Sequence, residues 1–107
     1  MDKDLHSIQE ARQLVQTAHA AWKKFEEFSE EQVETILGAI SRAGIAHART
    51  LAELAVAETG FGRVEDKTLK NLFAARNVYD AIRPLKTVGI VNEDKKKKII
   101  EVASPVG

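Results

Sequence analysis

The sequence predicts a mainly α-helical fold with a C-terminal β-hairpin. From Leu5 to Ile82, apolar residues recur at steps of three and four, a spacing that places them on one face of a helix. Residues typical of helix ends divide this stretch into segments. After Pro84 the pattern changes to short runs rich in β-branched residues, which are typical of strands. We therefore expect a helical segment over residues 1–86, with helices at about 4–27, 30–46, 49–59 and 64–83, and a hairpin over residues 87–104.

The composition is that of an ordinary globular protein, and it argues against several kinds of partner. Of the 107 residues, 44% are hydrophobic and 30% are charged, so we do not expect disorder. Sixteen Lys and Arg residues balance sixteen Asp and Glu residues, which removes the basic excess that favours nucleic acids and membrane surfaces. No apolar stretch reaches the roughly 20 residues that cross a bilayer. We expect neither a nucleic-acid nor a membrane partner.

The sequence contains no cysteine. Disulfides, thiolate metal ligands and a cysteine nucleophile are therefore excluded within these 107 residues. The first residues also lack the basic and then apolar layout of a secretory signal. We expect a cytoplasmic location.

The first helix is amphipathic. Its apolar residues, which include Leu5, Ile8 and Val15, fall on one face, and Gln, Lys and Glu residues cover the other. Such a helix needs a partner surface. Trp22 and Phe25 belong to the same stripe, so packing in a core is a better interpretation than a ligand platform.

The second helix has a clear start. Ser29 and Gln32 are spaced as a capping box, and Phe28 and Val33 as the matching hydrophobic staple. The apolar pattern weakens further on and changes phase around residues 47–50. Two interpretations stay open: two helices with a short break near residues 46–49, or one long bent helix. Gly60 is placed to end this region in the left-handed conformation.

The last helix and the tail complete the predicted fold. Pro84 stops the helix of residues 64–83, and residues 87–91 and 99–103 are β-type runs on either side of a polar turn at 92–95. An isolated hairpin is marginal in water, so this one needs a further partner. The buried face that we expect on the last helix is formed by Leu69, Leu72, Phe73, Tyr79 and Ile82.

Candidate catalytic groups are few, and each has a simpler interpretation. His6, His19 and His47 are too far apart in sequence to pair as metal ligands on one helix, so we expect ordinary helix positions. Glu58 lies next to a glycine-containing loop and could serve as a general base. A glutamate at a helix end is more often a cap or an ion-pair partner.

Two loop motifs could meet phosphate groups. Gly60 and Gly62 are spaced as in a phosphate-binding loop, but they follow a predicted helix instead of a strand, and the third glycine is missing. The run Lys95–Lys98 lies at the predicted hairpin tip, where lysines usually keep an edge solvated. We assign no catalytic, cofactor-binding or metal-binding residue.

Several segments together point to one family. They are Glu58–Lys67, Lys70–Ala74, Val78–Tyr79, Lys86–Ile90, Ile100–Ala103 and Pro105–Gly107. In this order, they resemble the N-terminal region of CoA-acylating (acetylating) aldehyde dehydrogenases, within the aldehyde dehydrogenase superfamily. That family includes the aldehyde half of bifunctional aldehyde-alcohol dehydrogenases. The resemblance runs from near residue 5 to the last residue, and it implies that the chain is an N-terminal fragment of the α/β aldehyde dehydrogenase fold.

The resemblance also implies a reaction. In the family, aldehyde, CoA and NAD become acyl-CoA and NADH through a cysteine nucleophile. That cysteine and the nucleotide-binding strands follow the Pro105–Gly107 segment, so residues 105–107 are expected to begin a nucleotide-binding domain that this sequence does not include. No catalytic or cofactor residue carries over. Lys67, Lys70 and Asn71 match the family pattern, and we expect only helix-surface pairing from them.

Two classes of function therefore remain. The first is the scaffold segment of a CoA-acylating aldehyde dehydrogenase, inactive alone, whose partners are the rest of the enzyme and other subunits of a homo-oligomer. NAD and CoA then belong to the family and are not bound by this chain by itself. The alternative is a non-catalytic helical module for interaction or assembly. A small standalone enzyme that uses Glu58 or a histidine ranks behind both.

Overall fold

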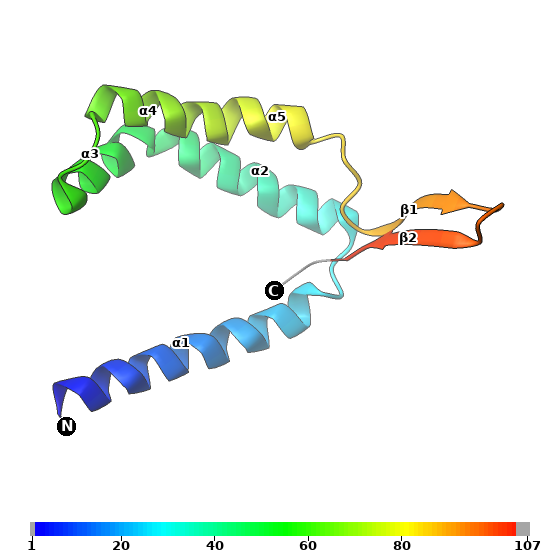
Figure 1. Cartoon of the computed structure of the whole chain (residues 1–107), viewed down its shortest axis with the longest axis horizontal. Coiled ribbons are helices and arrows are strands. Elements are labelled where there is room, and N and C mark those ends of the chain that lie inside the picture. The colour runs from blue at the N-terminus through cyan, green and yellow to red at the C-terminus, as the bar shows by residue number, and fades with distance from the viewer. Residues whose placement is uncertain (1, 105–107) are drawn as a thin grey trace. The chain divides into compact units, whose positions relative to one another are not determined.

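The computed structural model describes residues 2–104. It has helices followed by an antiparallel two-stranded hairpin (Figure 1), which confirms the predicted fold class. The chain divides into two compact units, residues 31–85 and the segments on either side of them. The expected start of a nucleotide-binding domain at residues 105–107 lies outside the described residues.

Helix α1 spans Lys3–Phe25 and has no buried residue. The Asp2 carboxylate caps it by accepting a hydrogen bond of 2.8 Å from the Lys3 N–H. Its apolar stripe is uncovered: Leu14 and Val15, for example, are 66% and 68% exposed. The core position expected for Trp22 is not observed, because the half-buried ring packs on neighbours of its own helix, 5.4 Å from the ring of His19.

Helices α2 (Glu30–Ala46) and α3 (Ala48–Thr59) meet at His47. His47 leaves the helical conformation, with φ −106° and ψ 12°, yet its N–H still donates to the Ala43 carbonyl at 3.0 Å. The chain is therefore bent at a one-residue joint between two helices. Gly60 ends α3 with φ 71°, and its N–H donates to the Val56 carbonyl at 2.8 Å. This confirms the predicted left-handed helix end.

The last helix differs from the prediction of one regular α-helix over residues 64–83. It consists of α4 (Val64–Leu72), a six-residue π-helix η1 (Phe73–Val78) and the short α5 (Tyr79–Ile82). The Leu85 N–H donates to the Ile82 carbonyl at 3.0 Å, so the helix closes around Pro84 as predicted. A π-helix adds a residue to a turn.

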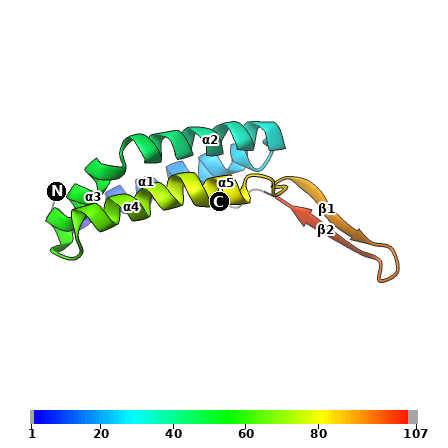
Figure 2. The same ribbon diagram turned by 90° about the horizontal axis from the view of Figure 1, so that it is seen from above.

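Small residues bring the helices of this unit close together. The run from α4 to α5 lies antiparallel beside α2 (Figures 1 and 2), and Ala48 and Ala52 at the start of α3 are buried. On α2, Gly38 and Ser41 are buried as well. A Cβ atom added to Gly44 would lie 3.0 Å from the Cβ of Ala75. The two backbones therefore approach each other as closely as side chains without bulk allow.

The predicted buried face of the last helix is partly wrong. Leu69, Phe73 and Ile82 are 66%, 60% and 51% exposed, whereas Leu72 and Tyr79 are half-buried. The extra residue of η1 turns the following residues about the helix axis. In addition, no other described element of this unit covers the side of the last helix that faces away from α2. The apolar residues on that side therefore stay exposed.

The hairpin is formed by β1 (Gly89–Asp94) and β2 (Ile99–Ala103). Asp94 pairs with Ile99 and Gly89 with Ala103, and the register shifts between Ile90 and Asn92, which is a β-bulge. The polar residues 92–94, predicted to form the turn, belong to the strand. The turn lies instead at residues 95–98, where the Asp94 carboxylate accepts hydrogen bonds from two backbone N–H groups.

Candidate functional site

A cluster of polar side chains lies between α2 and α5, within the unit of residues 31–85. The carboxylate oxygen Oε1 of Glu34 accepts two hydrogen bonds, one of 2.7 Å from the Tyr79 hydroxyl and one of 3.0 Å from Nε of Arg83. The second is also an ion pair. These groups border a shallow depression of about 360 Å³, lined by Glu31, Glu34, Thr35, Gly38, Arg42, Tyr79 and Arg83.

The hydrogen bond to Glu34 favours the protonated form of Tyr79. The hydrogen bond to Glu34 raises the pKa of the Tyr79 hydroxyl above its ordinary value of 10.0, and partial burial acts in the same direction. The positive charges of Arg83 and Arg42 oppose the rise. A phenolate here would face the Glu34 carboxylate at hydrogen-bond distance, so the neutral phenol is the favoured form.

This arrangement fastens two helices together and does not resemble catalytic machinery. Glu34 is occupied by two donors, and a protonated tyrosine is not a base. Two acidic and two basic side chains line the depression, so their formal charges cancel. We refer to Glu34, Tyr79 and Arg83 as the polar clasp.

Two further hydrogen bonds join helices of this unit. The Ser41 hydroxyl donates to the Ala75 carbonyl at 2.6 Å, and the Asn71 amide donates to the Ala48 carbonyl at 2.9 Å. The expectation that Asn71 takes part only in helix-surface pairing is therefore wrong. Its amide reaches the backbone next to the bend at His47. No sequence signal names this partner, because the two residues lie 23 positions apart.

The histidines and Glu58 lie on different elements of the chain. His6 and His19 lie on α1, His47 occupies the joint between α2 and α3, and Glu58 is exposed in the last turn of α3. Within residues 2–104, no group of three or more His, Asp or Glu side chains is placed to hold a metal ion. Over the same residues, no helix is long and apolar enough to cross a membrane.

The loop Gly60–Gly62 connects two helices and does not fit a dinucleotide. It follows α3 and leads into α4, whose first turn carries Glu65 and Asp66. Acidic residues at a helix N-terminus compete with a phosphate group for the same dipole. Phe61 at the centre of the loop is 78% exposed. The residues of this loop therefore do not suit the phosphate groups of NAD.

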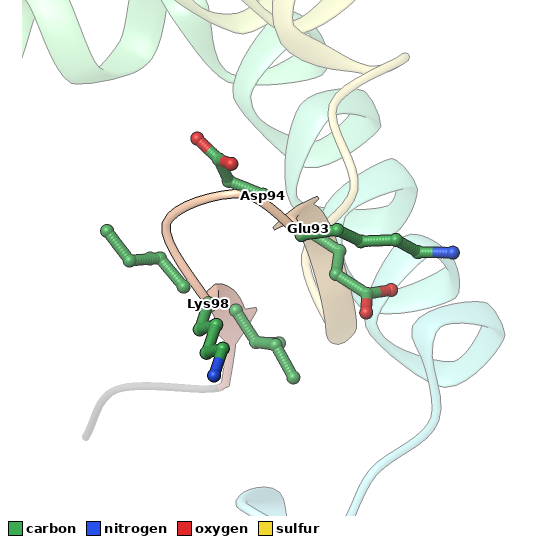
Figure 3. Close-up of a pocket in the computed structure, with 6 residues that line it drawn as sticks. Glu93, Asp94 and Lys98 are labelled. Atoms are coloured by element: carbon green, nitrogen blue, oxygen red, sulfur yellow. The ribbon is translucent and has the colours of Figure 1, made fainter.

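The lysine run forms the tip of the hairpin. The Asp94 carboxylate accepts from the N–H groups of Lys96 and Lys97, each at 3.0 Å, so it organises the turn. Lys98 has φ 56°, a conformation that favours glycine or asparagine. The tip borders a depression of about 260 Å³, and Figure 3 shows the side chains of Asp94 and Lys98 pointing in different directions. These contacts describe a solvated turn.

Comparison with known proteins identifies relatives of this chain. No family model matches the chain. The bifunctional aldehyde-alcohol dehydrogenase of Escherichia coli K12 is 38% identical over 101 residues, which are 94% of this chain and 11% of that protein. The acetylating succinate-semialdehyde dehydrogenase of Clostridium kluyveri is 34% identical over 96 residues, 90% of this chain and 21% of that protein.

A solved structure agrees with these two relatives. The acetylating aldehyde dehydrogenase of Geobacillus thermoglucosidasius is 48% identical and superposes with a TM-score of 0.87, over 99% of this chain and 24% of that one. The chain is a homologue of acetylating aldehyde dehydrogenases. The predicted resemblance is thereby confirmed. The chain spans 11% and 21% of the length of the two curated relatives.

Proposed function

We propose that this chain is the N-terminal scaffold of an NAD-dependent, CoA-acylating aldehyde dehydrogenase, which converts an aldehyde, CoA and NAD to acyl-CoA and NADH. The observation that carries the proposal is the similarity along nearly the whole chain. It covers 99% of the residues at 48% identity in an acetylating aldehyde dehydrogenase, and no observation favours a separate interaction module.

The scaffold role is supported by what these residues contain. The 107 residues include no cysteine, whereas the family reaction uses a cysteine nucleophile. The Gly60–Gly62 loop does not fit a dinucleotide, and the polar clasp fastens helices. The nucleophile and the sites for NAD and CoA then belong to the rest of the enzyme.

The partners follow from the uncovered surfaces. The apolar stripe of α1 and the apolar residues of the hairpin, such as Ile100 and Val102, are exposed within the described residues, and an exposed apolar patch marks a surface for contact. In the proposed function these surfaces face the remainder of the dehydrogenase and other subunits of a homo-oligomer. The enzyme then works in the cytoplasm, without a nucleic-acid or membrane partner.

An exchange of segments tests the proposal. The matching segment of the Geobacillus thermoglucosidasius enzyme is replaced by this chain, and NADH formation from acetaldehyde, CoA and NAD is followed by absorbance. We expect the hybrid to be active, the enzyme without the segment to be inactive, and the purified 107-residue chain to form no NADH.

A matched control separates scaffold from catalysis. In the hybrid, Glu58→Gln removes the carboxylate considered as a general base without changing the size of the side chain. A scaffold role predicts activity within about twofold of the unsubstituted hybrid, since exposed substitutions of this kind change stability little. NADH formation by the isolated 107-residue chain, or a soluble hybrid without any activity, would contradict the proposed function.

A further inference from the structure

The hydrogen bonds around Ala75 distinguish the π-helix η1 from a regular α-helix. In an α-helix the Tyr79 N–H would donate to the Ala75 carbonyl, four residues back. Here the Tyr79 N–H donates to the Arg76 carbonyl. The Ala75 carbonyl accepts a hydrogen bond of 2.6 Å from the Ser41 hydroxyl of α2. The Ser41 hydroxyl of α2 therefore binds the same carbonyl to which the Tyr79 N–H would donate in a straight α-helix.

Ser41 and Ala75 are held together by the close approach of the helices. Ser41 is only 7% exposed, and a buried hydroxyl requires a hydrogen-bond partner. Gly44, one turn further along α2, leaves just enough room for the Cβ atom of Ala75. The buried Ser41 hydroxyl is thus confined to the neighbourhood of the Ala75 carbonyl.

The extra residue of η1 decides which side chains face α2. One residue corresponds to a rotation of about 100° in an α-helix. A straight α-helix through the same residues would turn Tyr79 and Arg83 away from Glu34 by about that angle. Val78 and Ile82, which stand one position earlier and are 39% and 51% exposed, would take their places. Each pair is spaced by four residues, so either pair presents one continuous face.

We propose that the helix from Val64 to Ile82 is a two-register element in which Ser41 selects the register. In the π register the Ser41 hydroxyl holds the Ala75 carbonyl, and Tyr79 and Arg83 close the polar clasp on Glu34. In the α register the Tyr79 N–H regains the Ala75 carbonyl, Val78 and Ile82 face α2, and Glu34 is released. The two registers exchange a polar contact between the helices for an apolar one.

Tyr79 reports the register directly, because it is the only tyrosine of the chain. Its ionisation is followed by ultraviolet absorbance during a pH titration of the 107-residue protein and of the Ser41→Ala variant. The clasp predicts a pKa of Tyr79 above 10.0 in the unsubstituted protein and a return towards that value in Ser41→Ala. Ser7→Ala is the matched control, because Ser7 on α1 donates to the Lys3 carbonyl within its own helix and its loss leaves the pKa of Tyr79 unchanged.

Two further measurements separate a change of register from unfolding. Through-hydrogen-bond NMR couplings identify the acceptor of the Tyr79 N–H, which we expect to change from Arg76 to Ala75 in Ser41→Ala. Deletion of the exposed Asn77 removes the extra residue and moves Tyr79 and Arg83 one position earlier, so a straight α-helix then keeps them facing Glu34. In this variant we expect helical circular dichroism to persist and the pKa of Tyr79 to stay above 10.0.

Several outcomes overturn the proposal. They are an ordinary pKa of Tyr79 in the unsubstituted protein or after deletion of Asn77, a raised pKa in Ser41→Ala, and an unchanged acceptor of the Tyr79 N–H in Ser41→Ala. Loss of helical signal in both variants also counts against it, since a two-register element keeps its helix in either state.

Discussion

The Asn71 side chain of α4 donates a hydrogen bond of 2.9 Å to the backbone carbonyl of Ala48, the first residue of α3. Ala48 is 3% exposed, so few other donors can reach this carbonyl. The bond connects α4 to the place where the chain bends at His47. It explains how a bend without proline keeps a fixed geometry, because the residue after the joint is held from outside its own helix.

Removal of this bond should destabilise the helical unit. In Asn71→Ala we expect the free energy of unfolding to fall by about 1–3 kcal/mol, since a partly buried acceptor loses its donor. The measurement is urea unfolding followed by circular dichroism. Asn77→Ala, at an exposed position of η1, is the control and should change stability by less than about 0.5 kcal/mol. Equal effects of the two substitutions would argue against a special role for Asn71.

Gly60 offers a test of backbone conformation alone. A Cβ atom at this position would meet nothing within 4 Å, while φ is 71°. Gly60→Ala should therefore cost about 1–2 kcal/mol through the left-handed conformation, without any clash. Gly60→Asn should cost clearly less, because asparagine tolerates this conformation. Thermal unfolding of the two variants checks the order, and equal losses would show that conformation is not the cause.

Replacement of Lys98 by glycine should increase the stability of the hairpin. Lys98 is the one non-glycine residue among residues 2–104 with a positive φ, at 56°. Lys98→Gly should relieve about 1 kcal/mol of backbone strain in the turn, and protection of the hairpin amides from hydrogen exchange should rise. Lys97→Gly is the control in the same turn, where the change should be neutral or unfavourable. A loss of protection in Lys98→Gly would contradict this account.

The raised pKa of Tyr79 predicts that the stability of the folded protein decreases at alkaline pH. The folded-state pKa of Tyr79 is raised above 10.0, so the folded protein retains a proton that the unfolded chain has released. The stabilisation is complete below the unfolded pKa and is lost as the pH rises through the folded one. Unfolding temperatures measured between about pH 8 and 11 should decrease more steeply for the unsubstituted protein than for Tyr79→Phe. Parallel profiles would exclude a contribution from the clasp.

The exposed apolar surfaces predict self-association of the isolated chain. An uncovered helix stripe and free strand edges both favour contacts between copies. Light scattering at rising concentration should show species larger than the monomer, and Val102→Lys on β2, 64% exposed, should reduce them. A monomer over the whole concentration range would count against the scaffold role.

Local signals predicted the elements well, and contacts between helices explain what they missed. The helix end at Gly60 and the stop at Pro84 depend on the backbone chemistry of single residues, so the sequence alone shows them. The π-helix depends on Ser41, 34 positions before its partner Ala75. Periodicity therefore misplaced Ile82, which an extra residue in η1 turns away from α2.

The residues of the polar clasp could not be predicted from the sequence as the fold could. Glu34, Tyr79 and Arg83 each have an ordinary place in an amphipathic pattern, and only the antiparallel arrangement of α2 and α5 brings them together. The spacing of 45 and 49 residues between these partners is not a motif. The hairpin turn was misplaced because polar residues 92–94 suit a solvated edge strand as well as a turn.

The small residues on the inner side of α2 have an entropic consequence. Alanine and glycine lose no side-chain rotamers when they are buried, whereas a long charged side chain loses up to about 2 kcal/mol of rotamer freedom. Contacts of Gly38, Gly44 and Ala75 therefore order the two helices without freezing flexible side chains. The cost of ordering is concentrated in Glu34 and Arg83, at the far end of α2 from the bend. We expect the two helices to separate first at that end and last where glycine faces alanine.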